Sequence, residues 1–177
     1  MTEELRKAER EQAEKSKHNL VKANLSGGNL DHADFSGGNL NEADLSYANL
    51  FFANLSRANL EKADLSKSKL SKSNLREANL SGADMNEADI RSANLSGANL
   101  SGANLADADL SLADLTCANL ANVNLEEAEL KGADLTDAVG LTDQQINSAL
   151  LNKETRLPAY LEITWITDKK FECRHKN

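Results

Sequence analysis

The chain has 177 residues, of which 4% are aromatic, and its formal net charge is −8. It contains no run of roughly 18 apolar residues, so we expect no membrane-spanning helix. The first 17 residues lack the apolar core of a secretory signal. Cys117 and Cys173 show neither metal-binding nor redox spacing. Together these features predict a cytoplasmic protein without disulfide bonds.

Residues 1–18 form the first of three expected regions. They hold five basic and five acidic residues, and their apolar content is limited to Leu5, Ala8 and Ala13. Glu3 and Lys7 lie four residues apart, which is a stabilising spacing for an ion pair on a helix. We therefore expect a solvated helix over residues 3–17 that covers the start of the next region poorly.

Residues 19–140 carry a repeat of five residues. Between positions 20 and 135, all 24 positions in register are apolar, and 21 of them are Leu, the others being Phe35, Met85 and Ile90. Two positions before the apolar residue, 18 of 23 residues are Ala. Immediately before it, 22 of 24 residues are Asn or Asp. This region therefore has one apolar, one small and one turn-forming residue per unit.

Neither a helix nor a straight strand can bury a residue at every fifth position. A helix turns about 100° per residue, so the leucines would scatter around its surface. A strand alternates sides with a period of two, so successive leucines would face opposite ways. The small residue and the Leu can both point inward if the chain bends after each unit. The repeat therefore predicts stacked coils around one continuous apolar interior.

Units such as Ala43-Asp44-Leu45-Ser46-Tyr47 and the doubled SGANL at 96–105 resemble the pentapeptide-repeat family, whose consensus is Ala-(Asp/Asn)-Leu-x-x. The resemblance implies an all-β solenoid, a right-handed quadrilateral β-helix with four units per coil. At that number, residues 19–140 would form about six coils and a rod roughly 29 Å long. A short N-terminal helix and a C-terminal capping helix would flank the rod.

The third region, residues 141–177, begins with the signals of a helix start. Thr142 and Gln145 form a capping box, and Leu141 and Ile146 are placed as a hydrophobic staple. We expect a helix from about Asp143 to Asn152 that covers the end of the solenoid. Similar segments end many bacterial proteins of the resembled family.

Apolar residues alternate in the chain after Pro158, which predicts a short strand. With its neighbour Ile166, this alternation forms an apolar tail. A homodimer through this tail is one option for the protein. The candidate residues for that association are Leu161, Ile163, Trp165 and Ile166.

Aromatic residues gather at outward positions of neighbouring repeat units. Tyr47, Phe51 and Phe52 lie within six residues, in a chain with only seven aromatics. With four units per coil, Leu112 falls in the column of Phe52, three coils further on. Scattered apolar residues are normal on protein surfaces. The alternative is a protein-interaction surface formed by these four residues.

Acidic residues also fall into columns, one of which holds Asp44, Asp64 and Asp84. Such a column can share a cation, but we favour hydrogen bonds from each carboxylate to backbone amides at the turns. Lys69 falls beside Asp89 in another column, where it would compensate that charge. We expect no metal and no cofactor.

The sequence gives no support for catalysis. His18, His32 and His175 are far apart, and none has a nucleophile or metal ligand at a recognisable spacing. Residues 19–138 hold nine basic and eighteen acidic residues, which argues against direct binding of nucleic acid. We therefore expect no enzyme, but a scaffold or protein-interaction module whose partner the sequence does not identify.

An alternative function follows from the resemblance. Some members of the family resemble duplex DNA in size and charge, dimerise through their C-terminal ends and bind DNA gyrase, which gives quinolone resistance. The acidic solenoid and the apolar tail are compatible with such a role. Lys62, Lys67 and Lys72, interspersed among the acidic residues, argue against it.

Overall fold

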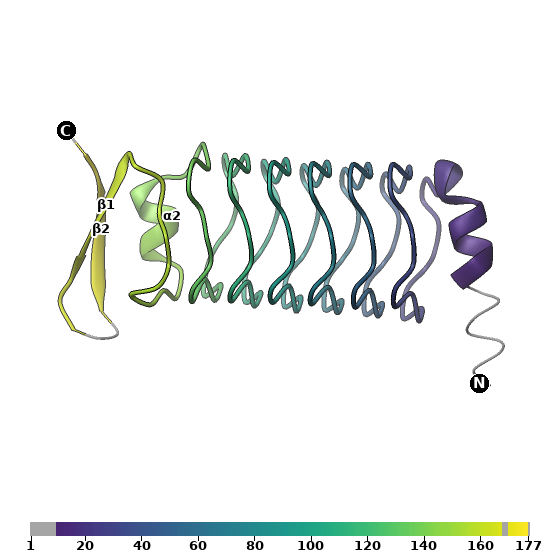
Figure 1. The fold of residues 1–177 in the computed structure, drawn as a ribbon, viewed down its shortest axis with the longest axis horizontal. Helices are drawn as coiled ribbons and strands as arrows, with labels where there is room; N and C mark the ends of the chain where they lie inside the picture. Colours follow the sequence, from purple (N-terminus) through teal and green to yellow (C-terminus); the bar gives the residue numbers. More distant parts are fainter. Residues whose placement is uncertain (1–9, 168–169, 177) are drawn as a thin grey trace.

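The structure is a computed structural model that describes residues 10–167 and 170–176. It is a straight rod of stacked coils with a helix against each end (Figure 1). The described part of the N-terminal helix covers residues 10–15 and leads into a 3₁₀ helix, η1 (Lys17–Asn19). At the other end, helix α2 (Asp143–Asn147) is followed by strands β1 (Leu161–Trp165) and β2 (Phe171–His175).

Each residue before a core Leu pairs in parallel with the residue twenty positions later. This pairing runs from Asn24 with Asp44 to Asn119 with Val139. One coil therefore contains four repeat units, as the resemblance implies. The bonds alternate in direction: the Leu45 amide donates to the Asp64 carbonyl (2.7 Å), and the Asp64 amide donates to the Ala43 carbonyl (2.9 Å). Each coil is thus hydrogen-bonded to the next on all four sides.

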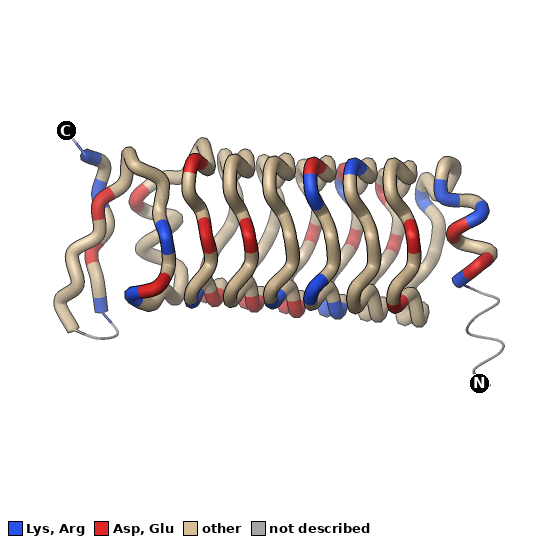
Figure 2. The backbone as a smooth tube through the Cα atoms, in the orientation of Figure 1, with Lys and Arg blue, Asp and Glu red and all other residues tan. Residues whose placement is uncertain are grey.

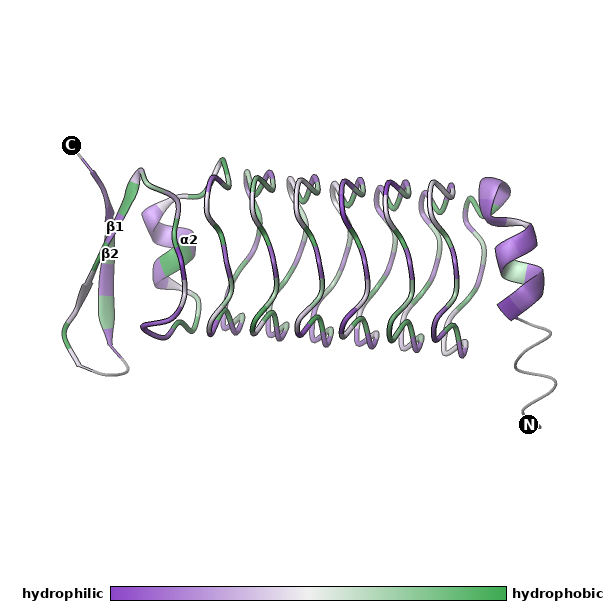
Figure 3. Cartoon of the chain, in the orientation of Figure 1, coloured by the Kyte–Doolittle hydropathy of each residue, from purple (hydrophilic) through white to green (hydrophobic). Residues whose placement is uncertain are grey.

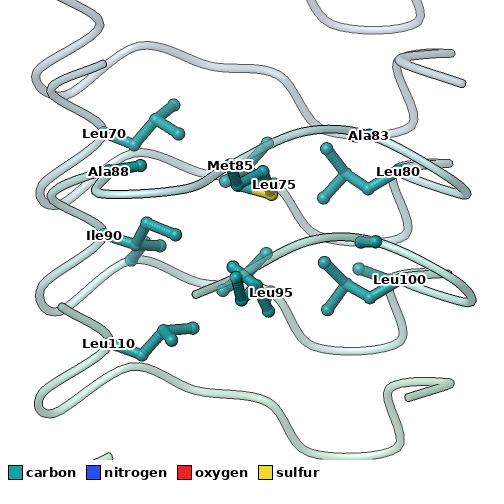
Figure 4. Packing of buried hydrophobic residues seen from close by; sticks show 14 of the residues in the cluster. Leu70, Leu75, Leu80, Ala83, Met85, Ala88, Ile90, Leu95, Leu100 and Leu110 are labelled. Carbon is teal, nitrogen blue, oxygen red and sulfur yellow. The ribbon is translucent and has the colours of Figure 1, made fainter. Parts of the chain in front are cut away.

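The interior of the rod is filled by the residues that the repeat predicts to be inward. From residue 30 to residue 135, every in-register Leu, Phe, Met or Ile is at most 3% exposed. Figure 4 shows Leu70, Ile90 and Leu110 one above another, each pointing into the interior. Figure 3 shows apolar segments recurring in successive coils. Since burial of one Leu contributes about 1.5–3 kcal/mol, this column dominates the stability of the rod.

Each unit turns its corner through a tight turn with a left-handed residue. The Ala63 amide, for example, donates to the Leu60 carbonyl across Glu61 and Lys62, and Lys62 has φ of 54°. A positive φ at the second central residue marks a type II turn. It recurs in all 24 units, of which eighteen have a residue other than glycine at that position. The corners therefore store backbone strain that the interior must offset.

The Asn and Asp residues stabilise the corners, as expected from the sequence. The side-chain oxygen of Asn59 accepts a hydrogen bond from the amide of Glu61, two residues later, and most other units repeat this bond. Asn residues also bond to one another between coils: Asn79 Nδ2 donates to Asn59 Oδ1 (3.0 Å) and Asn99 Nδ2 to Asn79 Oδ1 (3.2 Å). Such amide ladders add side-chain hydrogen bonds to the backbone stacking.

The C-terminal helix is shorter than the sequence predicts. The capping box of Thr142 and Gln145 is present, and Leu141 and Ile146 are buried. However, α2 ends at Asn147 and not near Asn152. The Leu150 amide donates to the Ala128 carbonyl, and the Leu150 carbonyl accepts from the Leu130 amide. The chain leaves the helix because the last coil needs these backbone partners.

The strand predicted after Pro158 is β1, and it pairs with a second strand, β2, that the sequence pattern does not predict. The two strands are antiparallel, with Leu161 opposite His175 and Trp165 opposite Phe171. Asn147 fixes this hairpin to α2, because its side chain bonds both backbone groups of Cys173 (2.8 and 3.1 Å). The hairpin and α2 together cover the C-terminal end of the rod.

The described residues cover the N-terminal end incompletely. Asn39 donates its amide to the Lys17 carbonyl, and the Lys17 ammonium lies 3.0 Å from an Asp34 carboxylate oxygen. Hydrogen bonds from Ser36, assisted by Lys17, lower the pKa of Asp34 to about 2. Ala23 and Leu25, however, are incompletely buried. The expected poor cover is therefore observed, and the part of the expected helix before residue 10 lies outside the described residues.

No helix among the described residues is both long and apolar enough to cross a membrane.

The inward serines provide a test of the packing. Ser68 and Ser73 take the place of Ala inside the rod, and their hydroxyls are buried without a hydrogen-bond partner. An unpaired buried hydroxyl costs about 1–3 kcal/mol. We predict that Ser68→Ala and Ser73→Ala each raise the free energy of unfolding by about 1 kcal/mol, measured by denaturant titration.

The matched control is Ser96→Ala, because the Ser96 hydroxyl donates to Asn94 Oδ1 (2.7 Å). This variant should lose stability or stay unchanged. Equal effects of all three substitutions would contradict the assignment of Ser68 and Ser73 as unpaired.

The corners provide a second test. Ser92 has φ of 55°, which glycine adopts without the steric cost paid by other residues. We predict that Ser92→Gly raises the free energy of unfolding by about 0.5–1 kcal/mol. Ser101, the first central residue of its turn, does not have a positive φ. Ser101→Gly should therefore lower stability in the same assay, and a gain there would refute the explanation by left-handed strain.

Candidate functional site

The aromatic residues selected from the sequence meet at one region of the rod near its N-terminal end. Phe51 and Phe52 are the two central residues of one turn, and their rings contact edge to face at 4.5 Å. Phe51 is half-buried, whereas Phe52 is 45% exposed and Tyr47, at the preceding corner, is 61% exposed. We call Tyr47, Phe51 and Phe52 the aromatic patch.

Residues of the neighbouring coils cover Phe52 on both sides. The ring of His32 stacks on that of Phe52 at 5.2 Å, and the Lys72 ammonium lies 5.4 Å from the Phe52 ring centre on the next coil. Lys72 also lies 5.9 Å from the ring centre of Phe51. A cation over an aromatic face is attracted by the ring quadrupole. These contacts hold the aromatic side chains in fixed positions.

Tyr47 has a similar neighbour on the following coil. The Lys67 ammonium lies 5.8 Å from the Tyr47 ring centre and 3.2 Å from a carboxylate oxygen of Glu87. The hydrogen bond to Glu87 and its charge raise the pKa of Lys67. Tyr47, Lys67 and Glu87 thus form a stack along one corner of the rod.

Leu112 lies apart from the aromatic patch but on the same corner as Phe52. It is 68% exposed, and its turn is three coils further along the rod. Leu112 leans over the next coil, where a Cβ at Gly132 would come within 2.8 Å of its Cδ2 atom. The glycine therefore leaves room for this exposed side chain.

The C-terminal candidates differ in exposure. Leu161 is 4% exposed and belongs to the core. Ile163 and Trp165 pack partly against that core, and the Trp165 ring lies 5.3 Å from that of Phe171. Ile166 is 52% exposed. Of the four residues, Ile166 is therefore the one that presents most of its side chain to a partner.

The acidic columns are bound to the turns. Asp44, Asp64 and Asp84 each accept a hydrogen bond from the backbone amide two residues later (3.0, 2.9 and 3.1 Å). This is the bonding that we favoured from the sequence. Within residues 10–167 and 170–176, no group of three or more His, Cys, Asp or Glu side chains is arranged to hold a metal ion.

The expected compensation of Asp89 by Lys69 is wrong. Arg91 donates two hydrogen bonds to the Asp89 carboxylate (2.8 and 2.7 Å), and they lower the pKa of Asp89 to about 2. Arg91 reaches Asp89 because it lies two residues later, on the same turn. Lys69 has no carboxylate within ion-pair distance among the described residues, and it extends toward the N-terminal end of the rod.

The sequence predicts a poorly covered N-terminal end but not the cavity that lies there. It has a volume of about 1020 Å³ and opens beside the N-terminal helix, where Leu20, Leu25, Tyr47 and Lys69 are among its lining residues. Gly27 and Gly28 are also in its wall, where a Cβ at Gly27 would meet no atom within 4 Å. The pair of glycines and the weakly apolar first region were the signals in the sequence. Tyr47 therefore links the aromatic patch to the open end of the rod.

The chain matches the model of a known family, described as pentapeptide repeats, with eight copies. The matched segments are residues 19–51, 53–91, 93–132 and 113–139. A comparison with curated proteins gave no match.

Solved structures of pentapeptide repeat proteins are also similar to the chain. HetL, a protein from Nostoc sp. PCC 7120 involved in heterocyst differentiation regulation, is 34% identical over 65% of this chain and 69% of its own, with a TM-score of 0.32. Rfr23 from Cyanothece 51142 is 26% identical over 85% and 99% of the two chains, with a TM-score of 0.35. QnrB1, a plasmid-mediated fluoroquinolone resistance protein, is 19% identical over 81% and 86%, with a TM-score of 0.42.

The family model covers nearly all of residues 19–139, and the 20-residue pairing gives the four units per coil that a square cross-section requires. The chain therefore belongs to the pentapeptide repeat family, whose members fold as right-handed quadrilateral β-helices.

Proposed function

We propose that the protein is a non-enzymatic interaction module, in which a rod of about six coils presents the aromatic patch to another protein. In this proposal residues 19–140 are the rod, and residues 1–18 and 141–177 are the regions that flank it. The exposure of Tyr47 and Phe52 on a hydrogen-bonded scaffold is the observation that carries the proposal.

The chemistry of the patch supports this role. Aromatic residues contribute much of the binding energy at protein interfaces, since they bury a large area with few rotatable bonds. The backbone of each turn is fixed by coil-to-coil hydrogen bonds, such as that from the Phe52 amide to the Ser71 carbonyl. Stacking by His32 and Lys72 restricts the side chains further. A partner therefore binds a surface that is already ordered.

We propose a cytoplasmic location for the protein. The two cysteines, one exposed and one buried, are both free, as in proteins of a reducing compartment.

A binding assay with a triple variant tests the proposed surface. We predict that Tyr47→Ser, Phe51→Ser and Phe52→Ser together reduce recovery of the specific partner at least about tenfold, in quantitative affinity purification of cross-linked complexes. Lys62→Ser and Asn122→Ser, at the same turn position on another corner, serve as matched controls. Circular dichroism verifies that each variant keeps its fold, and equal recovery by all variants would refute the role of the patch.

A second candidate function rests on the charge of the C-terminal half of the rod. Residues 81–139 contain eleven acidic and two basic residues, a net charge of −9. Such a surface resembles the charge of duplex DNA and would suit a protein that binds DNA gyrase.

A supercoiling assay distinguishes this candidate. If the protein binds gyrase in place of DNA, adding it should relieve quinolone inhibition at low concentration and inhibit supercoiling at high concentration. If the inhibition curve is unchanged over the whole concentration range, gyrase binding is rejected. The proposal that the aromatic patch binds another protein is not affected by that result.

A further inference from the structure

Phe52 and Leu112 form a matched pair of apolar side chains on one corner of the rod. Both occupy the left-handed position of their turns, and their coils are three apart. At the usual spacing of about 4.8 Å per coil, roughly 14 Å separates them. Lys72 and Ser92 hold the two equivalent positions between them. The corner therefore carries two apolar side chains that are separated by two polar ones.

We propose that a second copy of this chain packs side by side and antiparallel on this corner and the face beside it, with Phe52 of each copy against Leu112 of the other. The inference rests on the proposed function, because it names the partner of the aromatic patch. A two-fold axis would cross the rod between the coil of Lys72 and the coil of Ser92.

The symmetry fixes which residues face each other. A two-fold axis that lies in the interface and is perpendicular to the rod reverses the order of the coils but keeps each column opposite itself. The contacts are therefore reciprocal: whatever Phe52 meets on the partner, Leu112 meets in turn. In the same register Tyr47 faces Asp107 of the second copy and Phe51 faces Ser111.

Charges on the face between the Tyr47 corner and the Phe52 corner are complementary in this register. Lys67 faces Glu87 of the second copy, and Lys69 faces Asp89. At the edge of the contact, Asp31 faces Lys131. In the columns of Tyr47, Phe51, Phe52 and Lys69, no residue faces another of like charge. Lys69, which has no ion-pair partner among the described residues of its own chain, gains one.

Other arrangements set like charges against each other. Two parallel copies would place Lys69 on Lys69 and Asp89 on Asp89 of the partner. A shift of one coil from the proposed register would superimpose either the lysines at 69 or the aspartates at 89. Like charges in direct contact weaken association strongly. The register that brings Phe52 to Leu112 is thus also the one that the charges favour.

The charge distribution along the whole rod agrees with an antiparallel pair. Residues 19–80 contain seven basic and seven acidic residues, whereas residues 81–139 contain two and eleven. In Figure 2, most of the blue segments of the rod accordingly lie nearer its N-terminal end. Antiparallel packing places the half that carries the lysines against the acidic half of the partner.

Complementary variants test the contact by sedimentation velocity. The wild type should sediment as a dimer, with twice the chain mass of 19.2 kDa. Phe52→Lys and Leu112→Glu should each weaken dimerisation at least about tenfold, since each removes both apolar contacts. An equimolar mixture of the two variants should regain the dimer. In that mixture one contact is the native Phe52–Leu112 pair, and the other joins the new lysine to the new glutamate.

Two further measurements keep the test decisive. Asn122→Glu, on the opposite corner, should leave the dimer intact. If Phe52→Lys or Leu112→Glu unfolds the protein, the variants Asp31→Lys and Lys131→Glu take their place in the same experiment. These two sites are five coils apart within one chain, so they cannot compensate each other except between copies.

Three results would overturn the inference. They are a monomeric wild type at about 100 µM, dimers that persist in both single variants, and a mixture that stays monomeric. Failure here is distinguishable from failure of the proposed function. Suppose that the wild type is monomeric and that the triple serine variant no longer binds a partner other than a second copy. Self-association is then rejected, and the aromatic patch remains a binding surface for that other protein.

Discussion

The structure depends on one constraint: two side chains of every five-residue unit must enter a shared interior, and the chain must then turn within two residues. The left-handed residue at each corner is the consequence, because an extended backbone cannot turn a corner within two residues. Lys62 and Phe52 adopt this conformation although neither is glycine. The buried leucines offset that strain, and the Asn and Asp oxygens bind the amides that the turn leaves free.

The same constraint separates what the repeat fixes from what it leaves variable. Inward positions accept little besides Leu and Ala, and the serines at 68 and 73 are tolerated at the cost of unpaired hydroxyls. Outward positions have no such restriction, so the aromatic patch and the lysines beside it carry the information specific to this chain. Functional differences among rods with this interior must therefore lie in their outward columns and at their ends.

The sequence predicts the periodic part of the fold well, because one local rule repeats without interruption. It fails where neighbouring coils compete with local signals. The helix pattern after Thr142 favours about ten residues, but α2 stops after Asn147 so that Leu150 can complete the last coil. Similarly, column order places Lys69 beside Asp89, whereas Arg91, nearer in sequence, takes that carboxylate. The exposure of Tyr47, Phe52 and Leu112 followed from the repeat, but the cavity depended on packing of the N-terminal helix.

A regular solenoid turns sequence numbers into surface coordinates, since a step of twenty residues is one coil. The change of charge from Lys67 to Glu87 and from Lys69 to Asp89 therefore occurs at one height, near the middle of the rod. A two-fold axis at that height sets Lys67 and Lys69 against Glu87 and Asp89 of the partner, whereas an axis one half-coil higher or lower sets Lys69 on Lys69 or Asp89 on Asp89. Phe52 and Leu112 lie equally far on either side of this height. Charge order and apolar spacing are independent features of the sequence, and they select the same axis.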